Sequence, residues 1–263
     1  MSSTGLPGRR TGVSRARLVV RQARLEQLAF WRNPEYAALT FALPVVLLLV
    51  LGATIAGHVQ PGTTVQEDTL LVPGMLAFGL IVAAYVNLAS RIAVLRSDGV
   101  LRRVAATPLP PGTYLASQLA STFVTTTLTA AATMAAGGIA FKAAPGAGGA
   151  VALATGLCLG TGCFAALAVA ISAAIPSAET AGPLTLVSYL PFAILSGVFS
   201  TTLTLPGWLS RGLAAFPVKA LVDVLRAGYA PGPQPFPVAG AAVLAAWTLL
   251  GVALACRFCR WLP

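Results

Sequence analysis

Residues 36–57 read YAALTFALPVVLLLVLGATIAG and carry no charged side chain. An α-helix rises about 1.5 Å per residue, so roughly 20 apolar residues are needed to cross the hydrocarbon layer of a bilayer. This stretch therefore predicts a membrane-spanning helix. Five further stretches have comparable length and character: 70–90, 115–140, 150–175, 183–203 and 238–255. We expect an all-α, polytopic membrane protein with six transmembrane helices.

The composition of the whole chain agrees with this expectation. Of its 263 residues, 57% are apolar and only 9% are charged, and the mean hydropathy is +0.82. A soluble domain carries about 25% charged residues, so these values exclude an ordinary soluble fold. Four cysteines are too few for a disulfide scaffold, and the basic residues are not embedded in a soluble fold that could bind nucleic acid. No cleavable signal peptide is expected, because the first apolar run starts after residue 35 and is long enough to span.

The charged residues are unevenly distributed, with 17 Lys and Arg against 7 Asp and Glu. Six spans place both termini on one side of the membrane. Thirteen basic residues fall on that side: Arg9, Arg10, Arg15, Arg17, Arg21, Arg24, Arg32, Arg91, Arg96, Arg102, Arg103, Arg257 and Arg260. Four fall on the other side: Lys142, Arg211, Lys219 and Arg226. Because cytoplasmic loops carry the excess of basic residues, we expect both termini in the cytoplasm and the protein in the cell membrane.

Two connectors are more than simple loops. One is the cytoplasmic stretch 91–114, and the other is the outer stretch 204–232, which has apolar residues at roughly helical spacing. Pro217 divides the outer stretch into two pieces that are each too short to cross, which indicates interfacial or re-entrant helices. Lys219 and Asp223 stand four residues apart in it and can form an ion pair. An amphipathic connector lying on the membrane surface is the alternative for both stretches.

The sequence carries no motif that would supply energy for active transport. A nucleotide-binding P-loop needs a glycine-rich segment ending in Gly-Lys-Ser/Thr, and neither Lys142 nor Lys219 has such neighbours. We therefore expect no ATP hydrolysis by this chain, no enzyme activity and no cofactor. None of the six spans contains Asp, Glu, Lys, Arg or His, which argues against proton coupling. The only histidine, His58, and the pair Cys256 and Cys259 fall short of a metal site, so no bound metal is expected.

Uncharged polar residues lie inside the spans and allow two interpretations. The candidates are Asn87, Thr125, Thr129, Ser188 and Ser196. Serine and threonine can return their hydroxyl groups to a carbonyl one turn earlier and so favour close helix packing. The alternative is that these residues face a translocation path for an amphipathic substrate.

The connectors carry a resemblance to a known family. Residues 96–110 read RSDGVLRRVAATPLP, and they resemble a cytoplasmic stretch of ABC-2 type transporter permeases in which a basic residue, Gly-x-Leu-x-Arg-Leu and Thr/Ser-Pro follow the second span. Leu205-Pro206-Gly207-Trp208-Leu209, Phe216-Pro217 and Leu225-Arg226 are similar to the re-entrant element before the family's last span, and Pro44 is similar to a proline of its first span. The resemblance covers roughly residue 21 to the C-terminus and is nearest to the daunorubicin-resistance-like exporters. Arg102 stands where many members carry Glu, and Val104 where Leu is commoner.

The resemblance implies an organisation and a mechanism. Residues 1–35 would form a basic tail with an interfacial elbow helix over 18–32, and residues 36–263 the six-span domain. Pro206, Trp208, Phe216, Pro217 and Arg226 would belong to the re-entrant outer element. A separate ABC ATPase would bind ATP and dock on the connector, with a second permease subunit, expected to be an identical copy, completing the transporter. The docking residues would be Arg96, Asp98, Gly99, Leu101, Arg102, Arg103, Val104 and Pro108, with Gly99 starting or hinging a short helix that Pro108 ends.

An ABC exporter of drug-like, antibiotic-like or lipid-like molecules is therefore the expected function. Basic groups in the connector, including Arg91 and Arg96, would meet acidic groups of the ATPase or anionic lipid headgroups. An ATP-independent channel or carrier remains the alternative, because the span pattern alone fits both.

Overall fold

The computed structural model describes residues 15–55, 67–99, 111–146, 148–199, 206–230 and 235–258, and within these the chain is helical throughout, with no strand. Its elements are α1 (Arg15–Trp31), α2 (Pro34–Ile55), α3 (Glu67–Ile81), η1 (Val82–Val86), α4 (Asn87–Ser97), α6 (Pro111–Phe141), α7 (Gly149–Ser172), α8 (Ala178–Leu195), α9 (Gly207–Ala214), α10 (Pro217–Ala227) and α11 (Val238–Phe258). The expected all-α architecture is confirmed.

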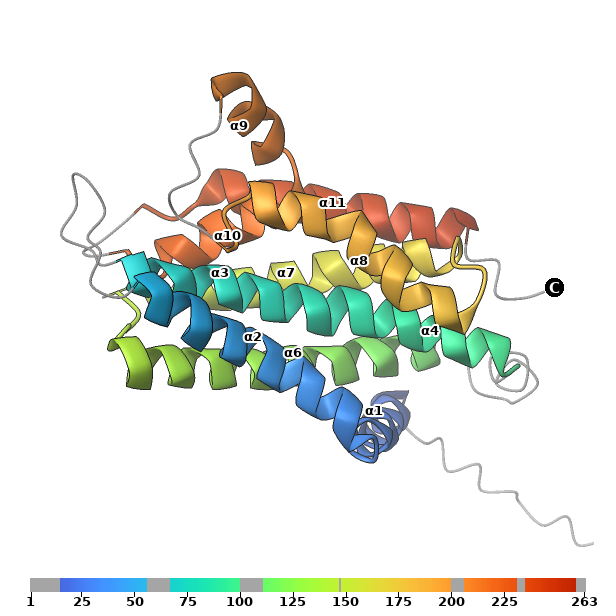
Figure 1. Ribbon diagram of the computed structural model, residues 1–263. Helices are drawn as coiled ribbons and strands as arrows, with labels where there is room; N and C mark the ends of the chain where they lie inside the picture. Colours follow the sequence, from blue (N-terminus) through green and yellow to red (C-terminus); the bar gives the residue numbers. More distant parts are fainter. Residues whose placement is uncertain are drawn as a thin grey trace, which may run out of the picture.

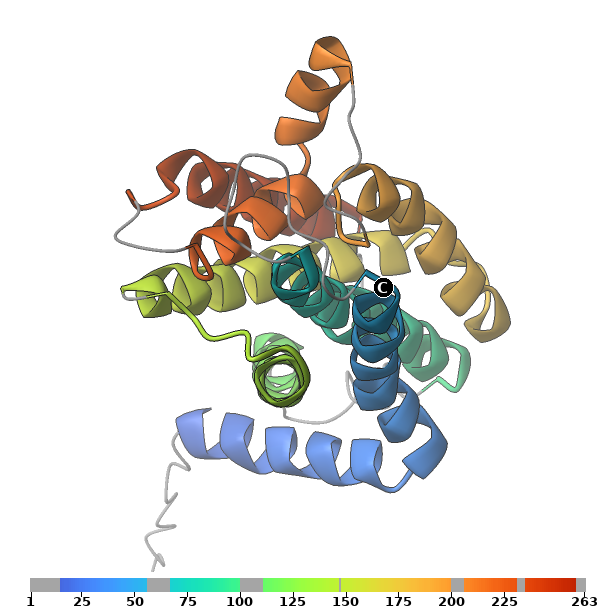
Figure 2. The same cartoon turned by 60° about the vertical axis from the view of Figure 1, so that its left-hand side comes forward.

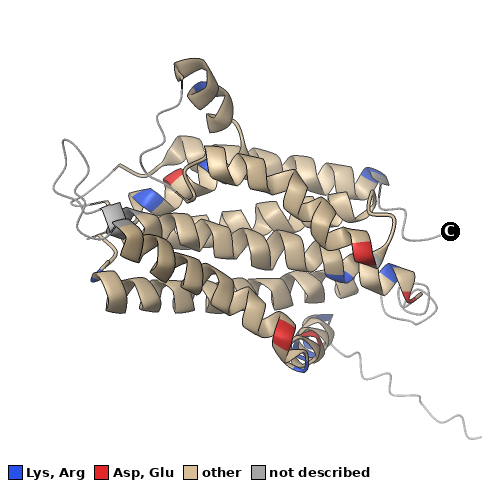
Figure 3. Ribbon diagram, viewed as in Figure 1, with Lys and Arg blue, Asp and Glu red and all other residues tan. Residues whose placement is uncertain are grey.

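The long helices lie side by side in one bundle (Figure 1). Helix α1 runs across one end of it, as Figure 2 shows, and α9 and α10 lie toward the opposite end. The last turns of α4 and α11 lie at the same end as α1 (Figure 1). Charged residues of the described chain gather toward the two ends and leave the middle of the bundle free (Figure 3). A charge at the centre of a bilayer is expensive, so this distribution suits a membrane-spanning bundle.

The central helix is longer than the sequence indicates. Elements α3, η1 and α4 form one continuous helix, of which Leu71–Ser97 is long and apolar enough to span a membrane and is mostly buried in the protein. The predicted span ended at residue 90 because Arg91 is charged. The helix continues for two more turns because Arg91 and Arg96 find partners within the chain. Both arginines therefore belong to the end of this helix rather than to the connector after it.

Five helices of the described chain have the length and composition of a membrane span: Pro34–Thr54, Leu71–Ser97, Gly112–Phe141, Gly149–Ser172 and Val238–Arg257. They match five of the six predicted spans. The remaining predicted span, 183–203, has no match among these five. Helix α8 lies there and covers Ala178–Leu195. With 18 residues it is about 27 Å long, slightly short of a full crossing.

Local chemistry explains the bounds of α8. Ser177 and Thr180 form a capping box, in which each side chain bonds the backbone N–H of the other residue, so the helix starts before Pro183. The predicted span began at residue 183, but Pro183 lies inside the helix, where its missing N–H leaves the carbonyl of Glu179 without its usual helical partner. The helix ends at Leu195 because Gly197 adopts a φ of 74°, a left-handed conformation that glycine readily accepts.

Glycines bring the helices close together. A Cβ atom at Gly156 would lie 2.8 Å from Cδ2 of Leu225, and one at Gly160 would lie 2.7 Å from Cδ1 of Leu221. Both leucines belong to α10 and are fully buried. Helix α7 can therefore hold α10 tightly only because these positions lack a side chain.

The outer element consists of two short helices, α9 and α10, on either side of Pro217, as predicted. Helix α10 is inserted among α3, α7, α8 and α11 and buries Val218, Leu221, Val222 and Leu225. Helix α9 projects away from the bundle (Figure 1), and Trp208 on it is 75% exposed. Only the second half of the element is thus packed into the bundle.

Candidate functional site

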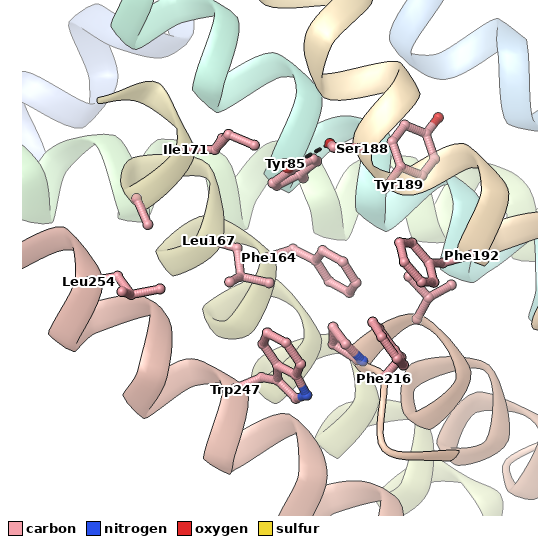
Figure 4. A pocket seen from close by; sticks show the side chains of 13 residues that line it. Tyr85, Phe164, Leu167, Ile171, Ser188, Tyr189, Phe192, Phe216, Trp247 and Leu254 are labelled. Atoms are coloured by element: carbon pink, nitrogen blue, oxygen red, sulfur yellow. Dashed lines mark hydrogen bonds between the residues drawn. The ribbon is translucent and has the colours of Figure 1, made fainter. Parts of the chain in front are cut away.

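A cavity of about 380 Å³ opens beside the middle of the bundle, between α7, α8 and α11. Element η1 closes its back, and the corner between α9 and α10 closes one end (Figure 4). Its buried base is formed by Tyr85, Phe164, Tyr189, Pro217 and Val218. Half-buried residues make up its rim: Leu167, Ala170, Ile171, Ser188, Phe192, Phe216, Trp247 and Leu254. None of these residues is charged, which restricts the site to uncharged ligands or ligand parts.

The π-helix η1 positions one of the two tyrosines at the base. Its wider turn interrupts the regular helix at Val82–Val86, and Tyr85 within it lines the cavity. The Tyr85 hydroxyl lies 2.8 Å from the Ser188 hydroxyl of α8 (Figure 4). Ser188 also lies 2.6 Å from the carbonyl oxygen of Thr185 and donates its single proton there. Single-turn π-helices occur frequently at functional sites, because they reorient one side chain without breaking the helix.

Three stacked rings form the wall at the α9–α10 corner. Phe192 of α8 stacks on Phe216 with ring centroids 4.5 Å apart, and Phe216 stacks on Trp247 of α11 at 6.1 Å. The indole N–H of Trp247 donates to the carbonyl oxygen of Ala215 at 2.8 Å. This column ties α8, the outer element and α11 together at the cavity.

The five predicted translocation residues do not form one site. Ser188 lies on the cavity, whereas Asn87 donates to the Thr40 hydroxyl at 2.9 Å on the α2 side. Thr129 returns its hydroxyl to the carbonyl of Thr125, which supports the packing interpretation for that stripe. Thr125 accepts a hydrogen bond from Gln27 of α1. Ser196 is buried just after α8, and its hydroxyl has no hydrogen-bond partner among the described residues.

The predicted docking residues are only partly described. Arg96 donates to the carbonyl oxygen of Ser172 at 2.8 Å and also to that of Ile175, so it holds the last turn of α4 against the end of α7. Asp98 is the C-cap of α4, and Gly99 follows with a φ of 66°, so Gly99 ends a helix rather than starting one. The predicted residues Leu101, Arg102, Arg103, Val104 and Pro108 lie outside the described residues.

Arg91 also bonds within the chain. It forms an ion pair with Glu26 of α1, whose carboxylate accepts a further hydrogen bond from Gln22 at 3.0 Å. Gln27 donates to the carbonyl oxygen of Ser121 on α6 at 2.6 Å. The expectation that Arg91 meets an ATPase or a lipid headgroup is therefore replaced by an internal contact that fixes α1 across α4 and α6.

The predicted outer-element residues are all among the described residues. Pro206 is the N-cap of α9, and Phe216 and Pro217 mark the corner that reaches the cavity. Arg226, in the last turn of α10, donates to the carbonyl oxygen of Gly197 at 2.7 Å and so joins α10 to the turn after α8. Burial lowers the pKa of the Arg226 guanidinium, while the nearby Asp223 carboxylate opposes that shift. The expected ion pair between Lys219 and Asp223 is present.

The described residues contain no group of three or more His, Cys, Asp or Glu side chains able to hold a metal ion. Cys256 is exposed with a free thiol near the end of α11, and its predicted companion Cys259 lies outside the described residues.

Comparison with known proteins identifies the class. The sequence profile of the ABC-2 type transporter family matches residues 19–229, which extend from α1 to just beyond α10. The chain therefore belongs to the ABC-2 type transporter family and is a multi-pass membrane protein, the transport permease component of an ABC-type system. Permeases of this family generally work with an ABC ATPase and are not themselves catalytic. A search of curated proteins found no significant match.

Proposed function

We propose that this chain is the permease subunit of an ATP-driven exporter that is coupled to a separate ABC ATPase at the end of α4. The contact of Arg96 with the end of α7 carries the proposal. The connector expected to receive the ATPase starts directly after Asp98 and Gly99. A displacement of that connector would pass through Arg96 to the α7–α8 turn, and both α7 and α8 line the cavity.

Several finer features belong to the same proposal. The excess of basic residues at the end that holds α1 supports cytoplasmic termini in the cell membrane. Two copies of the chain with two ATPase subunits would make the transporter. The uncharged cavity supports an apolar or amphipathic cargo, drug-like, antibiotic-like or lipid-like, as exported by the daunorubicin-resistance-like type.

Reconstitution separates an ATP-driven exporter from an ATP-independent channel or carrier. The chain is placed in liposomes with and without a partner ABC ATPase from the same organism, and efflux of fluorescent amphipathic dyes is measured. ATP-dependent flux only with both proteins supports the proposal. Equal flux from the chain alone would reject it in favour of the channel or carrier.

A variant of Arg96 tests the coupling path itself. We expect Arg96→Ala to retain membrane insertion and ATPase binding but to lower transport per ATP hydrolysed, because α4 no longer pulls on the end of α7. Arg24→Ala, an exposed arginine on α1, is the matched control and should transport normally. Equal transport per ATP in the two variants would contradict the assigned path.

A further inference from the structure

We propose that the aromatic cavity between α7, α8 and α11 is a binding site for an uncharged, largely apolar ring molecule that carries an O–H or N–H donor and enters from the membrane. The inference deepens the proposed function. It rests on that function only for the direction of transport. It adds a cargo class and a specificity residue, Tyr85.

The size and lining of the cavity suit such a ligand. Pockets for small molecules enclose about 300–1,000 Å³ and are mostly apolar and aromatic, with a few polar groups that fix orientation. The present cavity measures about 380 Å³ and has aromatic side chains from α7, α8, η1, α11 and the α9–α10 corner. A charged ligand group would be left without a partner here, because no lining residue carries a charge.

The surroundings indicate where the ligand comes from. Val187 on α8 is 70% exposed and Leu249 on α11 is 72% exposed, so the outer faces of the two helices beside the cavity are apolar. Such faces suit lipid and not water. The half-buried rim on these helices therefore opens toward hydrocarbon, and a ligand dissolved in the membrane can reach it without crossing water.

The hydrogen bonds made by the Tyr85 hydroxyl define the polar part of the ligand. Since Ser188 donates its proton to Thr185, the Tyr85 hydroxyl must donate to the Ser188 oxygen. The lone pairs of the Tyr85 oxygen then remain, because the Ser188 hydroxyl is the only hydrogen-bond partner of Tyr85 among the described residues. The site consequently accepts a hydrogen bond. Phospholipid acyl chains have no donor to offer, which separates the proposed ligand from bulk lipid.

The π-turn is a second, independent observation. Without the extra residue in η1, the face of the helix would be rotated and Tyr85 would not meet Ser188 across the cavity. The distortion is embedded in a helix that is otherwise regular and buried. An irregularity that places a hydrogen-bond acceptor in an apolar cavity points to ligand selection.

Two matched fluorescent probes test the site: 1-pyrenemethanol, which has a hydroxyl donor, and 1-methylpyrene, which does not. The full chain in lipid nanodiscs, with and without its ATPase, is titrated with each probe, and energy transfer from tryptophan to pyrene is recorded. We expect saturable transfer, with 1-pyrenemethanol binding about threefold to tenfold more tightly than 1-methylpyrene. Tyr85→Phe should abolish this preference and leave the binding of 1-methylpyrene unchanged.

Ala170→Phe fills the cavity from its rim and should remove saturable binding of both probes, whereas Leu249→Phe adds the same ring on the lipid side and should not. Non-saturable transfer, or equal binding in these two variants, would overturn the proposal. Saturable binding without a hydroxyl preference would overturn the assignment of Tyr85. Because binding needs neither nucleotide nor flux, a failure of ATP-driven export would leave these results unaffected.

Discussion

The indole N–H of Trp247 donates to the main-chain carbonyl of Ala215 at 2.8 Å and ties the last helix to the corner of the outer element. The rings of Phe216 and Phe192 continue from Trp247 to α8. The Trp247 side chain of α11 thus helps to hold α10 beside the cavity.

Replacing Trp247 should loosen this corner. We expect Trp247→Phe to retain part of the stacking but to lose the hydrogen bond, lowering the free energy of unfolding by about 0.5–1.5 kcal/mol. Thermal unfolding in detergent measures the change. Trp208→Phe, on the projecting helix α9, should have little effect, and an equal loss in both variants would argue against a special role for the Ala215 contact.

The ion pair between Glu26 and Arg91 should be strongly coupled. Glu26→Ala leaves the Arg91 guanidinium largely buried without its carboxylate, so we expect a loss of about 3–5 kcal/mol. A double variant, Glu26→Ala with Arg91→Ala, should lose less than the sum of the two single losses. Glu35→Ala, an exposed carboxylate nearby in sequence, is the control. Additive losses would show that the pair contributes no interaction energy.

Close packing of α7 against α10 should make Gly160 intolerant of a side chain. A Cβ there would come within 2.7 Å of the fully buried Leu221, so we expect Gly160→Ala to destabilise the protein by about 1–3 kcal/mol. Gly162→Ala lies on the same helix and would meet only Thr248, at 4.0 Å. Thermal unfolding of the two variants tests the contact, and similar midpoints would mean that α10 shifts easily away from α7.

Gly99 should matter through its backbone conformation. Its φ of 66° strains any other residue, although no atom lies within 4 Å of where a Cβ would stand. We therefore expect Gly99→Ala to insert normally and to uncouple ATP hydrolysis from transport, because the chain leaves α4 in a different direction. Gly112→Ala has the same free space in a right-handed helix and should remain coupled. Normal coupling in Gly99→Ala would remove Gly99 from the coupling path.

The sequence alone predicts most of the fold. The free energy of moving an apolar segment from water into the membrane is a sum over the residues of that segment alone. Five spans and the break at Pro217 therefore follow from the sequence. The bounds of the central helix and of α8 do not, because Arg91 and Arg96 depend on distant partners and Ser177 on a cap that outweighs Pro183.

The residues of the candidate site also divide into those that the sequence indicates and those that only the structure brings together. Ser188, Phe216 and Pro217 could be singled out from the sequence, whereas Tyr85, Phe164, Phe192 and Trp247 were not, although each is an aromatic residue inside an apolar helix. The sequence by itself determined which segments leave water and at which end the charges remain. Only the tertiary structure decided that Tyr85 turns toward Ser188 and that Arg96 holds α7. Those contacts depend on helix rotation and on atoms over 70 residues apart, which no local pattern records.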